Sequence, residues 1–443
     1  MAAGLGLARA ASDPLADVVG PDGAGIGLLS RIERSPYRGI GSRQDLIPLY
    51  VYEGEYAYLR SYRLGLKLDA RPWRLDFFLT RRFEGTPYDL TGDELPGLAR
   101  REQGADVGVG LAWRGERRSA YLEAMRDATA VSHGGELRLG YREEFGSGRL
   151  RLRPHVMLGW RNSALNDYYY GVSAAEAAPG RPAYEPGAGG EAQLDLYAIY
   201  RLTSAWYAVG GLSATRRPSG VRSSPIVEGD RVQMGALLGL LYDFSPQQRS
   251  WPEGRPTIAR VFYGASSDCD MLQIMRLACT STHTQDTTSV AGYEIGRPFV
   301  QRLNGWPLDF ATFVGLVRHK ERGLQADFWQ VNGYIKAYYY GLPWSHRVNT
   351  RLGFGAGLSY ARRVPFMESR DQAVRGRDTS RLLNYMDPTV DLSLGDLIGV
   401  RKLRDTYVGL GVSHRSGIFG SSQLLGNVNG GSNYIYSYVE AAF

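Results

Sequence analysis

Apolar and polar residues alternate along much of the 443-residue chain. In L-R-L-R-P-H-V-M-L-G-W, residues 150–160, the even positions are apolar or proline, and most of the odd positions are arginine, histidine or glycine. Residues 105–113 and 351–360 repeat the alternation, with glycine frequent on the second face. A period of two predicts β-strands.

The two faces of these strands differ in a way that indicates a membrane protein. Glycine and arginine on one face suit a narrow barrel lumen, and an apolar face that ends in aromatic residues suits contact with lipid. No run of 18 apolar residues occurs, which excludes transmembrane helices. The terminal Phe443 lies on an alternating strand and resembles the assembly signal of bacterial outer-membrane barrels. The sequence therefore predicts an all-β protein, a transmembrane antiparallel β-barrel of the bacterial outer membrane.

A break near the middle predicts two barrels in tandem. One strand ends on Phe244, and the polar, proline-rich S-P-Q-Q-R-S-W-P-E-G-R-P, residues 245–256, reads as a linker. We expect ten to twelve strands in residues 22–244 and eight in residues 257–443. A single wide barrel that folds the linker into a turn is the alternative. The eight predicted strands lie near 257–264, 288–301, 308–318, 325–340, 347–363, 389–397, 406–416 and 433–443.

Residues 1–21 precede the first barrel. Their small-residue stretch A-R-A-A-S-D resembles the end of an export signal, which predicts a remnant of such a signal. A plain disordered N-terminus is the alternative.

An even number of strands places both ends of a barrel in the periplasm, with the long loops outside. This layout puts Cys269 and Cys279 in the first outer loop of the second barrel, and we expect them to form a disulfide. Two unpaired thiols are the alternative. Their spacing matches no metal motif, and the sequence predicts neither a metal nor a cofactor.

The formal net charge is +7. Lysine and arginine are scattered among the strands, which argues against a nucleic-acid partner. Arg370, Arg375 and Arg377 in an outer loop are candidates to contact lipopolysaccharide phosphates, and ordinary solubility is the alternative explanation of the charge.

The stretch Y-V-G-L-G-V-S-H-R-S-G-I-F, residues 407–419, contains the candidate chemistry. His414 and Ser416 continue an apolar stripe on the lipid face, at the outer end of a predicted strand. A serine becomes a nucleophile when an imidazole removes its proton, and the reaction also needs a group that orients the imidazole and N–H donors for the oxyanion. The glycine-rich loop after the strand, residues 420–433, is the candidate source of those donors. A polar cap at the membrane surface is the alternative role for both side chains.

The first half of the chain resembles the MipA/OmpV family of outer-membrane proteins. The resemblance rests on G-I-G-L-L-S-R-I-E-R-S-P-Y-R-G from Gly25, on Pro48, and on N-D-Y-Y-Y-G-V-S from Asn166 with the downstream Tyr184. It implies a scaffold for peptidoglycan-remodelling enzymes or an adhesin-like surface role, without catalysis. Asp127, Ser132 and His133 lie in a polar connection of this half, where we expect a loop rather than a hydrolytic set.

The H-x-S element on the penultimate strand resembles the PagL family of lipid A 3-O-deacylases, whose site faces lipid A from the outer barrel wall. The resemblance implies His414 as base and Ser416 as nucleophile. This chain departs from the family pattern at Gly417, where the family has asparagine, and at Asn433, where the family has a carboxylate. Glu440 lies on the same strand as Asn433 but too far inward to replace that carboxylate. Two main functions therefore remain open: an ester hydrolase acting on lipid A, and a non-enzymatic scaffold or surface-interaction protein. A pore is a third, weaker possibility, since small glycine-lined lumens pack closed.

Overall fold

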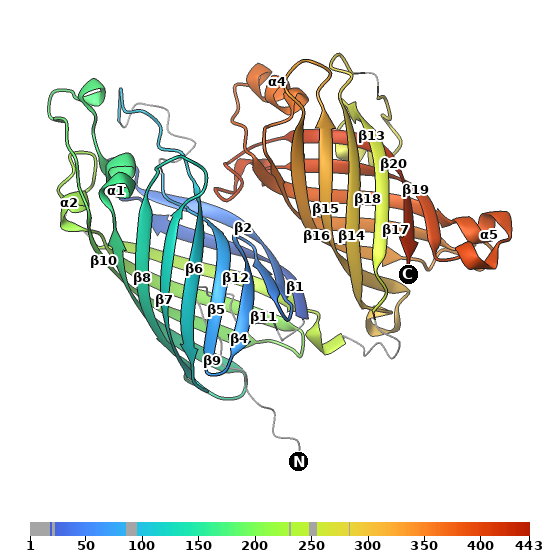
Figure 1. Cartoon of the computed structure of the whole chain (residues 1–443), viewed down its shortest axis with the longest axis horizontal. Coiled ribbons are helices and arrows are strands. Elements are labelled where there is room, and N and C mark those ends of the chain that lie inside the picture. Colours follow the sequence, from blue (N-terminus) through green and yellow to red (C-terminus); the bar gives the residue numbers. More distant parts are fainter. Residues whose placement is uncertain (1–17, 20–22, 86–94, 230–231, 248–254, 283) are drawn as a thin grey trace. The chain divides into compact units, whose positions relative to one another are not determined.

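The computed structural model describes residues 18–19, 23–85, 95–229, 232–247, 255–282 and 284–443. These residues form two compact units, Met1–Pro246 and Gln247–Phe443, and each contains one closed antiparallel barrel (Figure 1). No helix in the described part of the chain is long and apolar enough to cross a membrane.

Barrel 1, the closed barrel of the first unit, has twelve strands in sequence order. They are β1 (Gly23–Arg34), β2 (Ser42–Glu53), β3 (Ala57–Arg60), β4 (Arg63–Ala70), β5 (Trp73–Arg81), β6 (Ala105–Arg114), β7 (Arg118–Asp127), β8 (Gly135–Glu143), β9 (Leu150–Arg161), β10 (Gly189–Arg201), β11 (Trp206–Arg216) and β12 (Gln233–Asp243). Its short helices are α1 (Ser163–Tyr170), η1 (Ala174–Glu176), α2 (Ser219–Arg222) and η2 (Ser245–Gln247).

Barrel 2, the closed barrel of the second unit, has eight strands. They are β13 (Ile258–Ser267), β14 (Ser289–Val300), β15 (Leu308–Lys320), β16 (Phe328–Tyr339), β17 (Thr350–Ala361), β18 (Leu382–Ser393), β19 (Thr406–Ser416) and β20 (Gly431–Ala442). Its helices are α3 (Met271–Met275), η3 (Leu303–Gly305), α4 (Phe366–Val374), α5 (Leu394–Ile398), η4 (Arg401–Leu403) and η5 (Ile418–Gly420).

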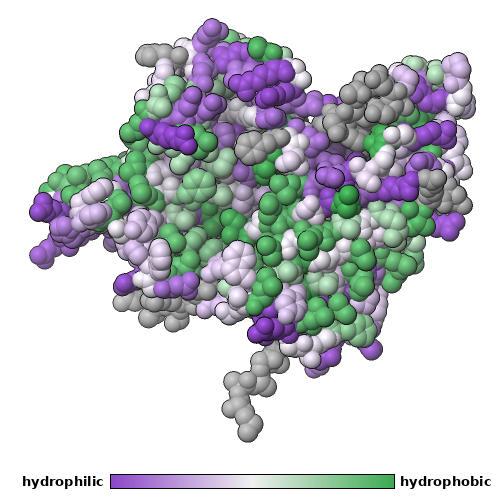
Figure 2. Space-filling model, turned by 180° about the vertical axis from the view of Figure 1, so that it is seen from behind, coloured by the Kyte–Doolittle hydropathy of each residue, from purple (hydrophilic) through white to green (hydrophobic). Residues whose placement is uncertain are grey.

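The period of two places apolar side chains outside both barrels and polar ones inside. On β4, Leu64, Leu66 and Leu68 are 51–60% exposed, whereas Arg63 and Lys67 at the alternate positions are buried in the lumen. Figure 2 shows, on the face drawn, hydrophobic side chains gathered over the strands and hydrophilic ones toward the loops. An apolar outer band around a polar interior is the construction of a membrane barrel.

In each barrel the longest connections leave from one end, and most connections at the other end are short. In barrel 1 the connection through α1 and η1 covers residues 162–188, whereas the turn between β4 and β5 covers residues 71–72. Outer-membrane barrels have short periplasmic turns and longer outer loops. We therefore assign the short-turn end of each barrel to the periplasm.

One predicted strand of barrel 2 was misplaced. The sequence pattern predicted a strand at 389–397, whereas β18 covers Leu382–Ser393 and α5 follows it directly. The predicted strand began directly after Pro388, at a residue type that usually marks a strand end because it has no N–H for a ladder. In the structure Pro388 lies inside β18, and the β18–β19 ladder skips from Met386 to Thr389.

Barrel 1 has an irregular wall beside β2. Because β3 is only four residues long, it pairs with Val51–Glu53 alone, so residues 42–50 of β2 have β1 as their ladder partner among the described strands. The chain after β5 lies beside this stretch, where Arg43 donates to the carbonyl oxygen of Gly85 at 2.9 Å. Pro48, part of the family resemblance, lies in this region, and an edge without a full ladder suits proline.

Candidate functional site

His414 and Asn433 form a hydrogen-bonded pair on the lipid-facing side of barrel 2. They are register partners on β19 and β20, and His414 Nδ1 lies 2.6 Å from Asn433 Oδ1. The Asn433 amide nitrogen donates to the carbonyl oxygen of Cys269 at 2.9 Å, which orients the amide so that its oxygen accepts from the imidazole. This arrangement assigns the proton to Nδ1 and leaves Nε2 as the basic nitrogen.

Ser416 is placed on the same face but is not joined to this pair. Two residues along a strand are about 6.6 Å apart, and within the described structure no hydrogen bond links Ser416 to His414. Its register partners are Asn384 on β18 and Gly431 on β20. The structure therefore brings together the predicted base and its orienting amide, while the nucleophile lies one repeat further out.

The glycine-rich loop after β19 does not present its N–H groups to Ser416. The amides of Gly420, Gly426 and Asn427 donate to carbonyl oxygens within the loop, at 2.8–3.0 Å. The loop also packs its apolar side chains inward, since Leu424 and Leu425 are fully buried. Donors for an oxyanion at Ser416 would require a different conformation of this loop.

Two of the three arginines expected to meet lipopolysaccharide phosphates have contacts within the protein. Arg370 pairs with Asp268 at 2.8 Å and with Asp286 and Asp371. Arg377 donates to the carbonyl oxygen of Asn429 at 2.9 Å. Arg370 is thus already neutralised by three carboxylates, which weakens its case as a phosphate contact.

A polar network fills the middle of the barrel 2 lumen, and a cavity of about 180 Å³ remains at the inner end. Arg260 lies 3.1 Å from Asp387 and 3.3 Å from both Glu294 and Glu440, and all four side chains are buried. Lys336 also pairs with Asp387. Glu440 faces this network near the inner end of β20, as expected from the sequence, and does not reach His414. Packed tyrosines complete the filling: Tyr334, Tyr338, Tyr385, Tyr434, Tyr436 and Tyr438.

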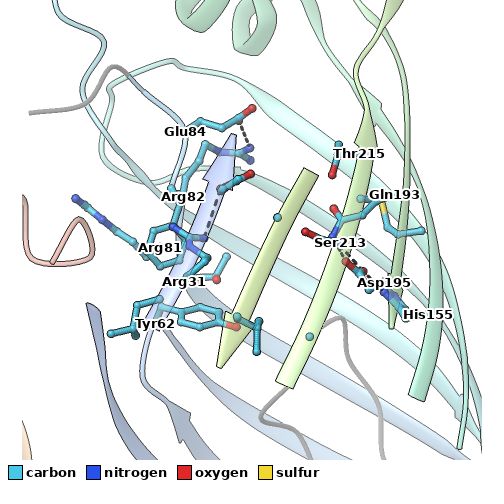
Figure 3. A pocket seen from close by; sticks show the side chains of 18 of the residues that line it. Arg31, Tyr62, Arg81, Arg82, Glu84, His155, Gln193, Asp195, Ser213 and Thr215 are labelled. Atoms are coloured by element: carbon cyan, nitrogen blue, oxygen red, sulfur yellow. Dashed lines mark hydrogen bonds and ion pairs between the residues drawn. The ribbon is translucent and has the colours of Figure 1, made fainter. Parts of the chain in front are cut away.

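Barrel 1 instead encloses a cavity of about 280 Å³. Figure 3 shows charged and polar side chains on opposite sides of it. The labelled residues are Arg31, Tyr62, Arg81, Arg82 and Glu84 on one side and His155, Gln193, Asp195, Ser213 and Thr215 on the other. Both ring nitrogens of His155 have a partner: one contacts Asp195 at 2.7 Å and the other contacts the Tyr121 hydroxyl at 2.9 Å.

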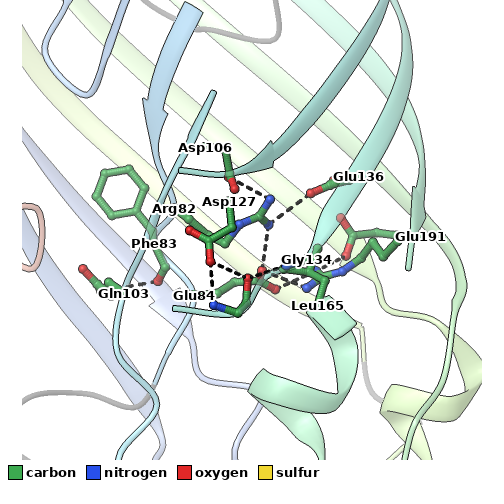
Figure 4. Close-up of polar contacts among 12 residues, drawn as sticks. Arg82, Phe83, Glu84, Gln103, Asp106, Asp127, Gly134, Glu136, Leu165 and Glu191 are labelled. Atoms are coloured by element: carbon green, nitrogen blue, oxygen red, sulfur yellow. Dashed lines mark hydrogen bonds and ion pairs between the residues drawn. The ribbon is translucent and has the colours of Figure 1, made fainter. Parts of the chain in front are cut away.

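Glu84, just after β5, organises the outer end of this cavity (Figure 4). It lies 2.6 Å from Arg161, 2.7 Å from Arg217 and 3.0 Å from Arg82. Burial raises the pKa of Glu84, but the three guanidinium groups outweigh burial and hold the pKa well below its usual range. The Tyr170 hydroxyl, from the D-Y-Y-Y-G-V element, also donates to Glu84 at 2.9 Å.

Residues of that element form a small core among the long loops of barrel 1. The buried members are Tyr37, Leu165, Tyr169, Tyr170, Val172, Val221, Ile226 and Val227. The sequence motif thus serves to pack the loops at the outer end of the barrel and to tie them to Glu84.

Asp127, Ser132 and His133 form a loop, as the sequence predicted. The Asp127 carboxylate accepts hydrogen bonds from the backbone N–H groups of Thr129, Ser132 and His133, at 2.6–2.9 Å. The His133 residue is exposed and has φ +54°. Across the described ranges, no group of three or more His, Cys, Asp or Glu side chains is placed to hold a metal ion.

The sequence reasoning missed the position of the disulfide loop. Cys269 and Cys279 are joined, but the loop between them lies against the lipid-facing wall at Val412 and Ile435. Its apolar run M-L-Q-I-M-R-L-A-C was the available signal, because an aqueous loop has no reason to carry so many apolar side chains.

Comparison with known proteins identifies barrel 1. Residues 24–244 match the family described as MltA-interacting protein MipA. The putative outer membrane protein YiaT of Escherichia coli K12 is 26% identical over 211 residues, which cover 46% of this chain and 84% of that protein. The MltA-interacting protein of the same strain is 26% identical over 235 residues, which cover 50% of this chain and 89% of that protein.

Neither the family match nor these relatives supports the PagL resemblance of barrel 2, since the family match ends at residue 244. The Pseudomonas aeruginosa protein OccK11 aligns with 95% of this chain and 96% of its own, at 11% identity and a TM-score of 0.25, which is too low to show a shared fold. The relatives named above and the two closed barrels place the chain in the bacterial outer membrane. Residues 24–244 of this outer-membrane β-barrel protein belong to the MipA family.

Proposed function

We propose that the chain is a non-enzymatic outer-membrane scaffold that binds a peptidoglycan-remodelling enzyme at the periplasmic end of barrel 1. The observation that carries this proposal is the likeness to MltA-interacting protein, which covers 89% of that protein and coincides with barrel 1. The closed interiors support a scaffold over a channel. Barrel 2 is filled by the Arg260 network, and the outer end of the barrel 1 cavity is bounded by the Glu84 ion pairs.

The periplasmic turns of barrel 1 offer a surface for such a partner. Tyr56, Phe145 and Leu202 are 61%, 49% and 42% exposed and lie in three different short connections. Exposed aromatic side chains are favoured anchors at protein interfaces. The partner, a periplasmic enzyme, meets this end of the barrel and not the long-loop end.

Binding of purified MltA to the full chain in detergent tests the proposal. We expect wild-type protein to bind and Tyr56→Ser combined with Phe145→Ser to weaken binding by about tenfold or more, the loss expected for two anchors of at least 1 kcal/mol each. Val374→Ser, in an outer loop of barrel 2, is the matched control and leaves binding unchanged. Absence of binding by folded wild-type protein contradicts the proposal.

A second candidate function is hydrolysis of an ester-linked acyl chain of lipid A by barrel 2. The His414–Asn433 hydrogen bond favours it, because an oriented imidazole with Nε2 free is what a serine hydrolase requires. Against it stand the amide in place of a carboxylate and the distance of Ser416 from the imidazole. Mass spectrometry of lipid A incubated with wild-type protein or Ser416→Ala decides: loss of one acyl chain with wild type alone establishes the hydrolase, and unchanged lipid with both removes it.

A further inference from the structure

The loop closed by Cys269 and Cys279 lies on the outside of the barrel 2 wall. Cys269, Ile274 and Val412 form a buried cluster, with Ile435 packed against it. Val412 and Ile435 are register partners on β19 and β20 and project from the lipid-facing side. The loop therefore covers wall side chains that lipid would otherwise contact.

The cover is confined to the outer end of these strands. Further inward on the same face, Leu410 is 59% exposed and Val439 is 44% exposed, whereas Val412 is only 5% exposed. Because the loop takes the place of lipid against the wall, the side of the loop that points away from the wall faces lipid. That side of the loop carries Leu272, Met275 and Leu277, which are 57%, 49% and 82% exposed.

The loop is amphipathic and internally hydrogen-bonded, as an interfacial segment must be. Backbone N–H groups of Ile274, Arg276 and Leu277 donate within α3 and its end, so little of the helix backbone is left for water to satisfy. On the polar side, Asp268 pairs with Arg370 of α4 and fixes the start of the loop to the outer loops. Leu277 adopts φ +57°, a conformation that glycine or asparagine usually adopts at a helix end. It is also more exposed than Leu272 and Met275.

We propose that residues 268–282 form a membrane-inserted cover whose outward face, Leu272, Met275 and Leu277, lies among the acyl chains of the outer leaflet. Three exposed apolar side chains on an amphipathic segment beside a lipid-facing wall bind to the boundary between headgroups and acyl chains. The cover also contacts the candidate site directly, since the Cys269 carbonyl oxygen accepts from Asn433. It thus stands between lipid and the His414–Asn433 pair. The proposal depends on neither candidate function.

Spin-label accessibility tests the cover in the full chain. Leu277→Cys carries a nitroxide, and the two native cysteines stay paired, which a non-reducing peptide map verifies. The protein is refolded and reconstituted into phosphatidylcholine vesicles. Val374→Cys in α4 is the matched aqueous control, because Val374 is 84% exposed, nearly as much as Leu277. Leu410→Cys on the wall is the lipid control.

The measured quantity is the ratio of the label's accessibility to dissolved oxygen over its accessibility to a water-soluble nickel complex. We expect this ratio at 277 to be severalfold above the ratio at 374 and close to the ratio at 410. A ratio at 277 equal to that at 374, in protein whose label at 410 reports lipid, overturns the proposal. Leu272→Cys supplies a second position if the first variant does not fold or its disulfide is exchanged. Binding of MltA and cleavage of lipid A are separate readouts, so failure here is distinguishable from failure of either function.

Discussion

The walls of the two barrels are built alike, whereas their interiors and loops differ. Both present apolar side chains to lipid, but the eight strands of barrel 2 enclose a space that tyrosines and the Arg260 network fill, whereas the twelve strands of barrel 1 leave a cavity of about 280 Å³. In barrel 1, the D-Y-Y-Y-G-V element packs the outer loops together. In barrel 2, the disulfide loop packs against the outer wall.

This difference shows where function resides in a chain of two similar folds. Strand number sets interior width, so the barrel 2 lumen is largely packed, with a cavity of about 180 Å³ at its inner end, and the candidate chemistry of this barrel lies on the outer wall. Barrel 1 has interior room, and it matches the family described as MltA-interacting protein MipA. The fold itself decides neither function.

The largest effect is expected from Arg260 in the barrel 2 lumen. Arg260→Met leaves Asp387, Glu294 and Glu440 buried without their shared cation, which costs about 3–5 kcal/mol. Urea unfolding followed by intrinsic fluorescence measures the loss. Arg118→Met removes an exposed pair on barrel 1 and is the control, with a much smaller loss because water screens the pair. Equal losses for both variants would contradict the packed-lumen description.

Two serines compare the interiors directly. Ser413 is 3% exposed inside barrel 2, and Ser413→Leu overpacks the lumen at a cost of about 1–3 kcal/mol. Ser213 lines the barrel 1 cavity, so Ser213→Leu has room and changes stability much less. The same unfolding experiment compares them. A larger loss at Ser213 would mean that the cavity does not accommodate a side chain.

Asn433 tests whether the disulfide loop is tied to the wall. Asn433→Leu removes its hydrogen bonds to His414 and to the Cys269 carbonyl oxygen, together about 1–2 kcal/mol. We expect faster amide hydrogen exchange in residues 268–282. Ser437→Leu, on the same strand and lipid-facing side, is the control and leaves exchange in this loop unchanged. Unchanged exchange in both variants would show that the hydrogen bonds do not hold the cover.

The smallest effect concerns a loop clamp in barrel 1, where Glu176 accepts from Arg101 at 2.8 Å. Burial raises the pKa of Glu176, but hydrogen bonds from Arg101 and from the N–H groups of Ser173 and Ala99 outweigh it and lower the pKa to about 2. A lowered carboxyl pKa contributes stability that is complete above the unfolded pKa of about 4.3 and is lost as the pH falls toward 2.

Hydrogen exchange of residues 95–104 against pH checks this clamp. In wild type we expect protection to decline below about pH 4. In Arg101→Gln, protection is already lower at neutral pH and changes less on acidification. An identical pH profile in the two proteins would contradict the assigned pairing.

Much of this architecture follows from local pattern. The lipid-facing residues of β19 could be predicted because an apolar stripe fixes which residues face lipid. Asn433 was singled out by the PagL resemblance, and its contact with His414 depends on the β19–β20 register. The strand around Pro388 was misplaced because a proline usually marks a strand end, whereas pairing with β17 keeps Pro388 inside β18. The apolar run of the disulfide loop indicated an apolar contact, but its partner could not be predicted, because Ile274 meets Val412 across more than a hundred residues.

Binding of purified MltA to the full chain tests the scaffold function most directly. The account predicts binding that Tyr56→Ser with Phe145→Ser weakens and that Val374→Ser leaves intact. The scaffold function is contradicted if folded wild-type protein does not bind MltA. Action through the periplasmic end of barrel 1 is contradicted if binding is lost with Val374→Ser but kept in the double variant.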